Sequence, residues 1–175
     1  HTKEVTSVTF SPDGKRIAFA SNRSGNWDLY LFDASSGEVT RLTNTPEYEG
    51  APTWSPDGSF LAFEAYLEDS LEVVIGPAEN PREGAILLTS SATADHSPAW
   101  SPGGRQIVFV SDGEIILADL DKTDDTRYAN LSNTADAAES HPLWSQDGTR
   151  LMWAASSQNV GRSGIYIWDS TRNAP

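Results

Sequence analysis

The sequence has no cysteine, a single methionine and few basic residues for a chain of 175 residues. Without cysteine it has no disulfide framework, thiol nucleophile or cysteine zinc site. Twelve lysines and arginines against twenty-five aspartates and glutamates give a formal net charge of −13. Because such a field repels a phosphate backbone, we expect no nucleic-acid partner. It attracts cations and basic protein surfaces, although an acidic surface also simply keeps a protein soluble.

Long hydrophobic runs are missing as well. No apolar stretch approaches the roughly 20 residues that span a bilayer, and none has the charged-then-apolar form of a signal peptide, so we expect no membrane insertion. The hydrophobic content of 38% and six tryptophans suffice for the core of a soluble globular protein. The first residue is His1 and not methionine, which indicates a processed product or a piece of a longer chain.

What the sequence does contain is an internal repeat. Four stretches related to Ser-Pro-Asp-Gly begin at serines that are separated by 44, 46 and 44 residues, and each follows an aromatic residue. Proline presets the second position of a turn and glycine adopts the left-handed conformation that returns the chain, so each stretch predicts a hairpin turn. The residues assigned to these turns are Pro12, Asp13, Gly14, Pro56, Asp57, Gly58, Gly104, Asp147 and Gly148.

Alternating apolar residues follow each turn at fixed offsets. Six and eight residues after the serines stand Ile17 and Phe19, Leu61 and Phe63, Ile107 and Phe109, and Leu151 and Trp153. This alternation predicts a strand with one face in the core. The residue between each pair is apolar too, which is typical of sheets packed face to face between other sheets.

The repeat predicts an all-β chain of four blades, at approximately residues 1–43, 44–89, 90–132 and 133–175. Each blade is expected to be a four-stranded antiparallel meander, with strands that include residues 5–11, 16–21, 51–55, 97–101, 106–111, 114–119, 127–132 and 142–145. The pattern requires no helix. The fourth blade lacks the closing strand that Leu-Thr or Leu-Ser marks in the other three. An open sheet edge invites pairing, so we expect a homodimer to form through these edges.

The motifs resemble those of one known family. Trp-Ser-Pro-Asp-Gly, an Ile-x-Phe strand, the stretch Ser-Asn-Arg-Ser-Gly-Asn-Trp-Asp-Leu-Tyr at 21–30 and a final Leu-Thr resemble the TolB-type, WD40-like (PD40) β-propeller repeat. The resemblance covers the whole chain and implies blades around a channel that their first strands line. Such rings have about six or more blades, so four blades look like part of a larger ring. The resemblance also implies a periplasmic or extracellular location.

By the same resemblance, the loops between blades and those between second and third strands share one rim. Glu49, Asp95 and Glu139 stand five residues before the tryptophans and would form an arc of carboxylates at the channel mouth. One interpretation is a site for a cation such as calcium or for a basic ligand. The other is structural, with each carboxylate accepting hydrogen bonds that set the blade register. No further cofactor is expected.

Other side chains on this rim carry interaction chemistry. Tyr48, Arg23 and Arg162 add aromatic and guanidinium groups of the kind enriched at protein interfaces. His96 and His141 lie in two of the inter-blade loops, at positions that are not equivalent. They raise the hypothesis of a channel metal like that of pectate-degrading lyases with this kind of propeller. The alternative is that both histidines cap or hydrogen-bond their loops.

The sequence shows no catalytic constellation. It contains no Gly-x-Ser-x-Gly elbow, phosphate-binding glycine loop or metalloprotease helix. We therefore predict a non-catalytic binding or scaffold module that presents its loop rim to a protein or peptide. Two alternatives stay open: the gating propeller of a prolyl-oligopeptidase-like serine peptidase, and a metal-dependent polysaccharide lyase that uses His96 and His141.

Overall fold

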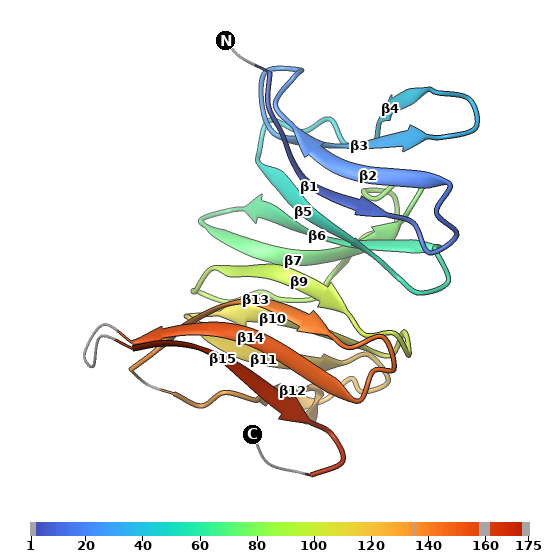
Figure 1. Ribbon diagram of the computed structural model, residues 1–175. Coiled ribbons are helices and arrows are strands. Elements are labelled where there is room, and N and C mark those ends of the chain that lie inside the picture. The colour runs from blue at the N-terminus through green and yellow to red at the C-terminus, as the bar shows by residue number, and fades with distance from the viewer. Residues whose placement is uncertain (1–2, 135, 158–161, 173–175) are drawn as a thin grey trace. The chain divides into compact units, whose positions relative to one another are not determined.

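A computed structural model describes residues 3–134, 136–157 and 162–172 (Figure 1). The described chain forms four antiparallel sheets, three with four strands and the last with three, which confirms the all-β prediction. The chain divides into two compact units, residues 1–96 and 97–175. Each unit is considered by itself below.

Unit 1 contains the first two sheets, each a meander in which strands adjacent in sequence pair. The first sheet comprises β1 (Val5–Phe10), β2 (Arg16–Ser21), β3 (Asp28–Asp33) and β4 (Val39–Arg41). The second comprises β5 (Glu49–Trp54), β6 (Phe60–Leu67), β7 (Ser70–Pro77) and β8 (Ile86–Leu87). Their facing sides share one core that includes Ala18, Leu29, Leu61, Phe63 and Val74.

Unit 2 holds nearly all of the third sheet and the whole of the fourth. The third comprises β9 (Asp95–Trp100), which starts in the last two residues of unit 1, β10 (Gln106–Ser111), β11 (Glu114–Asp119) and β12 (Tyr128–Asn130). The fourth comprises β13 (Ala138–Trp144), β14 (Arg150–Ser157) and β15 (Arg162–Asp169). Val108, Val110 and Ile115 pack against Leu151 and Trp153 between these two sheets.

One short helix departs from the prediction that none is needed. Asp125–Arg127 forms a single 3₁₀ turn before β12, so the strand begins at Tyr128 and not at Arg127. The carboxylate of Asp124 caps this turn by accepting a hydrogen bond from the Thr126 N–H at 3.0 Å. A local side-chain acceptor of this kind stabilises a turn that apolar periodicity does not reveal.

The predicted hairpin turns form as expected. In the first, the Gly14 N–H donates to the Ser11 carbonyl at 2.8 Å, and Gly14 has a φ of 69°. The Ser11 hydroxyl donates to the Asp13 carboxylate at 2.6 Å and accepts from the Arg16 N–H at 2.9 Å. The second turn repeats these bonds with Ser55, Asp57 and Phe60. Serine and aspartate therefore recur because they link the turn to the following strand.

The turn carboxylates make the stability of the fold depend on pH. The Ser145 hydroxyl, followed by the Thr149 N–H, lowers the pKa of Asp147 to about 2 from an ordinary value of 3.8. A carboxyl group whose pKa is lowered by folding stabilises the fold above its ordinary pKa, and that contribution is lost as the pH falls from about 4 to about 2. We expect Asp147→Asn to lower the stability measured by urea denaturation at pH 6, with a difference from the wild type that shrinks toward pH 2. A difference that stays constant with pH would contradict this account.

Each first strand contains a residue with positive φ that the sequence does not predict, and in β1, β5 and β13 it coincides with a bulge. Ser7, Ala51, Ser97 and His141 have positive φ values of 52°, 45°, 56° and 56°, and each lies three residues before the aromatic that ends its strand. In β5 the ladder jumps from Gly50 to Thr53, and in β13 it jumps from Ser140 to Leu143. A bulge bends and twists its strand, and left-handed backbone in a residue other than glycine costs free energy that the surrounding sheet must offset.

Candidate functional site

The three predicted rim carboxylates begin the first strands of their blades and are buried. Glu49 opens β5, Asp95 opens β9 and Glu139 is the second residue of β13. Their relative exposures are 0%, 2% and 4%. Buried carboxylates require compensating partners, so their hydrogen bonds decide what they can do.

Glu49 has the richest set of partners. Its Oε1 accepts from the Thr45 hydroxyl at 3.0 Å and lies 2.9 Å from the Arg82 Nε. Burial raises the pKa of Glu49, against the lowering effects of the Thr43 and Thr45 hydroxyls and of the Arg82 guanidinium. Arg82 belongs to the long loop between β7 and β8, so this ion pair ties that loop to the start of β5.

The other two carboxylates follow the same pattern. Asp95 Oδ2 accepts from the Ser91 hydroxyl at 3.1 Å, and Glu139 Oε1 accepts a short hydrogen bond from the Thr134 hydroxyl. In all three blades the donor lies four or five residues upstream, in the loop between blades. These bonds order the loop against its strand, which supports the structural interpretation of the arc.

A second series of hydroxyls explains the recurring Leu-Thr or Leu-Ser. The side-chain oxygens of Thr43, Thr89 and Ser132 accept from the N–H groups of Leu29, Val73 and Ile115 at 2.9 Å. Thr89 and Ser132 also donate to the carboxylates of Glu72 and Glu114 at 2.7 Å. The hydroxyl thus continues the ladder between third and fourth strands after the fourth strand ends.

The predicted aromatic and cationic residues make separate contacts. The Tyr48 hydroxyl donates to Glu64 at 3.0 Å, and burial beside that carboxylate raises the pKa of Tyr48 above its ordinary range. The Arg23 guanidinium carbon lies 5.0 Å and 4.7 Å from the ring centroids of Phe19 and Tyr30. Arg23 is therefore placed by a cation–π stack on the first sheet and by its bond to the Ser21 hydroxyl.

The remaining predicted residues lie in strands. His96 is the second residue of β9 and is half-buried, whereas His141 occupies the exposed bulge of β13. Arg162 opens β15, and its side chain is outside the described part of the structure. Among the residues that the structure describes, no group of three or more His, Asp and Glu side chains lies close enough to hold a metal ion. Within the same residues no helix is long and apolar enough to cross a membrane.

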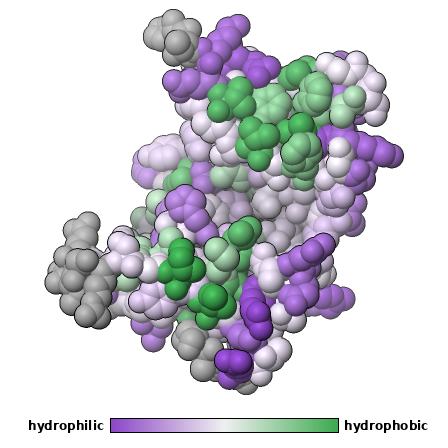
Figure 2. Space-filling view, in the orientation of Figure 1, coloured by the Kyte–Doolittle hydropathy of each residue, from purple (hydrophilic) through white to green (hydrophobic). Residues whose placement is uncertain are grey.

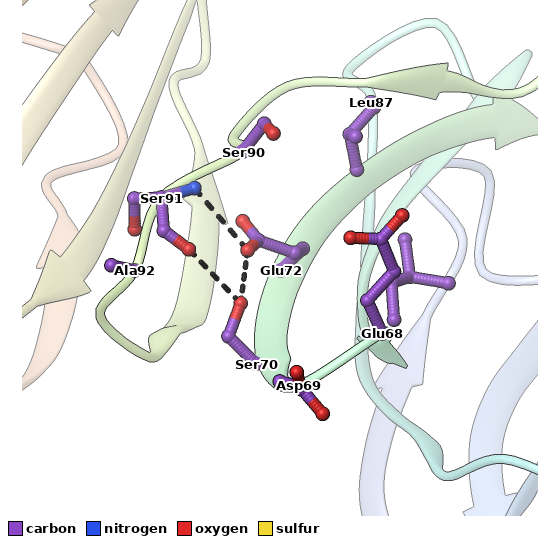
Figure 3. Close-up of a pocket in the computed structure, with 9 residues that line it drawn as sticks. Glu68, Asp69, Ser70, Glu72, Leu87, Ser90, Ser91 and Ala92 are labelled. Atoms are coloured by element: carbon purple, nitrogen blue, oxygen red, sulfur yellow. Dashed lines mark hydrogen bonds between the residues drawn. The ribbon is translucent and has the colours of Figure 1, made fainter.

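A pocket of about 490 Å³ opens on the second sheet, within unit 1 (Figure 3). It lies between the β6–β7 hairpin and the segment that follows β8, two of the loop types predicted to share the rim. The residues that line it are Leu67, Glu68, Asp69, Ser70, Glu72, Leu87, Ser90, Ser91 and Ala92. None of them is basic.

The interior of the pocket is held by a network around Glu72. Glu72 is buried and accepts from the Thr89 hydroxyl, from the Ser70 hydroxyl and, at 3.3 Å, from the Ser91 N–H. The Ser70 hydroxyl also lies 3.1 Å from the Ser91 carbonyl and shares its single proton between the two acceptors, so it bridges the hairpin and the opposite loop, as the dashed lines in Figure 3 show. The Ser91 hydroxyl donates to Asp95, so this predicted rim residue helps to hold the pocket-lining residue Ser91 in place.

Two carboxylates at the hairpin tip remain available. Glu68 and Asp69 are exposed, and neither forms an ion pair with another described residue. Glu68 has a φ of 53°, which turns the chain sharply at the tip of the hairpin. Leu87, on the other side of the pocket, is 46% exposed. The pocket therefore combines unpaired negative charge with apolar surface, a combination suited to a side chain with an aliphatic stem and a cationic head.

Sequence comparison places this chain near one family. Residues 2–118 match the family described as TolB beta propeller domain. A TolB homologue of Chlorobaculum tepidum is 34% identical over 118 residues, or 65% of this chain and 26% of that protein. An uncharacterised protein of Agrobacterium fabrum is 30% identical over 82% of this chain and 52% of its own length. An uncharacterised peptidase of Bacillus subtilis, YuxL, is 29% identical over 81% of this chain and 24% of that protein.

Solved structures agree on the fold. TolB from Acinetobacter baumannii superposes with a TM-score of 0.71 and 22% identity, over 93% of this chain and 43% of that one. A chain of the mitotic checkpoint complex superposes with a TM-score of 0.67 and 21% identity, over 96% of this chain and 47% of that one. The chain thus spans between about a quarter and a half of the curated relatives that it matches.

Proposed function

Because this chain belongs to the TolB beta propeller domain family, as its repeat motifs predicted, we propose that it is a non-catalytic binding module. Its partner is a protein or peptide segment that carries a basic side chain, and its site is the pocket between the β6–β7 hairpin and the segment after β8. The observation that carries the proposal is the unpaired acidity of this pocket. Two exposed carboxylates, Glu68 and Asp69, stand at a cavity without a basic residue, in a chain of net charge −13.

The pocket can accommodate both the aliphatic stem and the cationic head of such a side chain. The aliphatic stem of an arginine lies against Leu67 and Leu87, while its guanidinium reaches the two carboxylates at the hairpin tip. Glu72 contributes to the negative potential but keeps its own hydroxyl and amide partners. Because the network of Ser70 and Ser91 holds the two loops together without a ligand, the site is pre-organised, which lowers the entropic cost of binding.

The test compares two labelled peptides, Ala-Arg-Ala-Arg-Ala and the same peptide with citrulline in place of arginine. Citrulline keeps the shape of the side chain and removes its charge. We expect the arginine peptide to bind, as measured by fluorescence anisotropy. The variant Glu68→Gln/Asp69→Asn should raise its dissociation constant about five-fold, which corresponds to the roughly 1 kcal/mol that a partly exposed ion pair contributes. The variant Glu38→Gln/Asp125→Asn removes the same charge elsewhere and should bind like the wild type. Equal binding of both peptides would overturn the proposal.

A second function is supported by the similarity to YuxL, which is named a peptidase. On this alternative the chain is the propeller portion of a longer serine peptidase and restricts access to a catalytic domain outside these residues. The longer natural protein should then hydrolyse a peptide p-nitroanilide and react with a fluorophosphonate probe. A longer protein that consists of propeller blades alone and lacks both activities would leave the binding module as the function.

The polysaccharide lyase and the calcium site stay hypotheses that rest on His96, His141 and the three buried carboxylates. The lyase predicts that a transition metal raises the melting temperature and that His141→Ala abolishes the effect. The calcium site predicts that calcium raises the melting temperature and that Asp95→Asn abolishes the effect. A periplasmic or extracellular location is likewise proposed from the family resemblance. Cell fractionation of the source organism tests it.

A further inference from the structure

The pocket on the second sheet has a counterpart in the first sheet, because the first two repeats align position by position. The recurring Leu-Thr sets the alignment, since in both sheets its threonine hydroxyl accepts from a backbone N–H of the third strand. Three positions of the pocket are then equivalent to positions of the first sheet, and the pairs are Ser70 and Asn26, Glu72 and Asp28, and Leu87 and Arg41. The first sheet therefore shows which groups the repeat places at this position.

In the first sheet the chain supplies its own guanidinium. Arg41 Nη2 lies 2.7 Å from Asp28 Oδ2, and the Asp28 side chain is fully buried. Asn26 links the same region to the following loop, because its amide donates to the Thr45 carbonyl at 2.6 Å and to the Glu47 carbonyl at 2.9 Å. The repeat thus contains, once, an arginine paired with the buried carboxylate that begins the third strand.

In the second sheet the carboxylate is present and the arginine is not. Glu72 is buried, but Leu87 carries no charge and no basic residue lines the pocket. The link to the following loop persists, because the Ser70 hydroxyl lies 3.1 Å from the Ser91 carbonyl. Serine is smaller than asparagine and leucine is shorter than arginine, so a cavity of about 490 Å³ lies beside the buried carboxylate.

Both positions lie at strand ends, where this architecture carries its polar groups. Asp28 begins β3 and Arg41 ends β4. Over the first sheet, hydrophobic residues cover the middle of the strands and hydrophilic residues gather toward their ends (Figure 2). In the second sheet Leu87 likewise ends β8. A charged group of a ligand is therefore expected at this end of the sheet and not on its faces.

Glu72 can accept one further hydrogen bond. An ionised carboxylate offers about four lone-pair positions. Three donors already lie at its oxygens, namely the hydroxyls of Thr89 and Ser70 and the Ser91 N–H. The position that remains can take a donor from outside the chain, and a cationic donor would also supply the charge that Arg41 supplies to Asp28.

From these observations we propose that the pocket is a guanidinium site, in which an arginine of the partner takes the place that Arg41 has in the first sheet. This inference rests on the proposed function and restricts its ligand from any basic side chain to arginine. The guanidinium donates to Glu72 on its inner side, and Glu68 and Asp69 flank it at the hairpin tip. A planar guanidinium can donate in both directions at once, whereas the ammonium of lysine is a compact, strongly hydrated charge.

The first experiment gives the second sheet an arginine of its own. In Leu87→Arg the chain should pair a guanidinium with Glu72, as Arg41 pairs with Asp28, and so exclude the ligand. We expect the dissociation constant of Ala-Arg-Ala-Arg-Ala, measured by fluorescence anisotropy, to rise about ten-fold or more, because a tethered arginine competes at a high effective concentration. Ile86→Arg adds the same charge on the opposite side of the strand and should change the constant less than about two-fold. An equal effect of both variants, or no effect of Leu87→Arg, would overturn the proposal.

A second experiment distinguishes this inference from the proposed function. The peptide Ala-Lys-Ala-Lys-Ala has the same charge as the arginine peptide, and we expect it to bind the wild type about five-fold more weakly, the effect of one lost charge-assisted hydrogen bond. If the lysine and arginine peptides bound equally and the citrulline peptide did not bind, the pocket would remain a site for basic side chains and the guanidinium site alone would be overturned. If the citrulline peptide bound as tightly as the arginine peptide, or if no peptide bound, both would be overturned.

Discussion

Replacing Arg82 with alanine is expected to destabilise the protein by about 3 kcal/mol at pH 8, because the change strands a buried carboxylate. Glu49 is fully buried, and the Arg82 Nε at 2.9 Å is its cationic partner. Removing one member of such a pair leaves the other without compensation, and that costs more than the pair itself contributes. Urea denaturation of the wild type and Arg82→Ala measures the difference.

The pH dependence identifies the cause. Burial raises the pKa of Glu49 in the folded protein, so protonation relieves the penalty as the pH falls toward the ordinary value of 4.5. Arg82 opposes that rise, and without it the pKa of Glu49 should be higher still. The deficit of Arg82→Ala should therefore be large at pH 8 and smaller at pH 5. Adding Glu49→Gln should recover part of the loss at pH 8.

A matched control separates this effect from the loss of any arginine. Arg105 pairs with Asp121, but both side chains are more than half exposed. Exposed pairs contribute little, so Arg105→Ala should change stability by less than about 1 kcal/mol. If Arg82→Ala behaved like this control, Glu49 would not depend on its ion pair. The carboxylate would then be available to a cation, as the alternative interpretation of the arc requires.

The middle strands follow from the sequence almost residue by residue. The predicted limits 16–21, 106–111 and 114–119 are those of β2, β10 and β11. A turn with glycine precedes each of these strands, at Gly14, Gly104 and Gly113, so their starts are determined locally. In the last three blades the first strand is predicted too short, most of all β13, which begins at Ala138 while the prediction started at Pro142. Proline argues against a strand interior, but here Pro142 lies in a bulge that removes it from the ladder.

The site is less accessible to prediction than the fold. The repeat offsets single out Glu49, Asp95 and Glu139, and the structure shows that each has a hydroxyl donor in the preceding loop. Arg82 could not be assigned to Glu49 from sequence, because the eight-residue loop between β7 and β8 has no periodicity that determines where its side chains lie. In the second repeat Glu68-Asp69 stand where the first repeat has Asn-Arg-Ser-Gly. This difference between the repeats was the one feature of the sequence that pointed to the pocket.

The loop between β7 and β8 also makes Gly76 the glycine of unit 1 at which an added methyl group should destabilise the protein most. A Cβ built on Gly76 would lie 1.9 Å from the Pro81 carbonyl oxygen and 2.8 Å from the Pro81 Cα. Both are backbone atoms and cannot rotate away, so the loop itself must move. Overpacking of this kind costs about 3 kcal/mol. For Gly76→Ala we expect a melting temperature lower by roughly 6 to 12 °C, measured by circular dichroism.

Gly103 is the matched control, because nothing lies within 4 Å of its added Cβ and its φ is not positive. Gly103→Ala should leave the melting temperature within about 2 °C of the wild type. If Gly76→Ala were equally mild, the loop would accommodate a methyl group without loss, and its close approach to β7 would not constrain it.

Gly76 and Arg82 are expected to be coupled, since Pro81 is the residue before Arg82. A loop pushed away from β7 by the methyl group of Gly76→Ala withdraws the guanidinium from Glu49, so this substitution already removes part of what Arg82→Ala removes. The double variant should then be destabilised by less than the sum of the two single variants, by about 1 kcal/mol or more. Strict additivity would mean that Arg82 reaches Glu49 wherever the loop lies. Coupling would instead mean that the loop can hold Arg82 beside Glu49 only because Gly76 has no side chain.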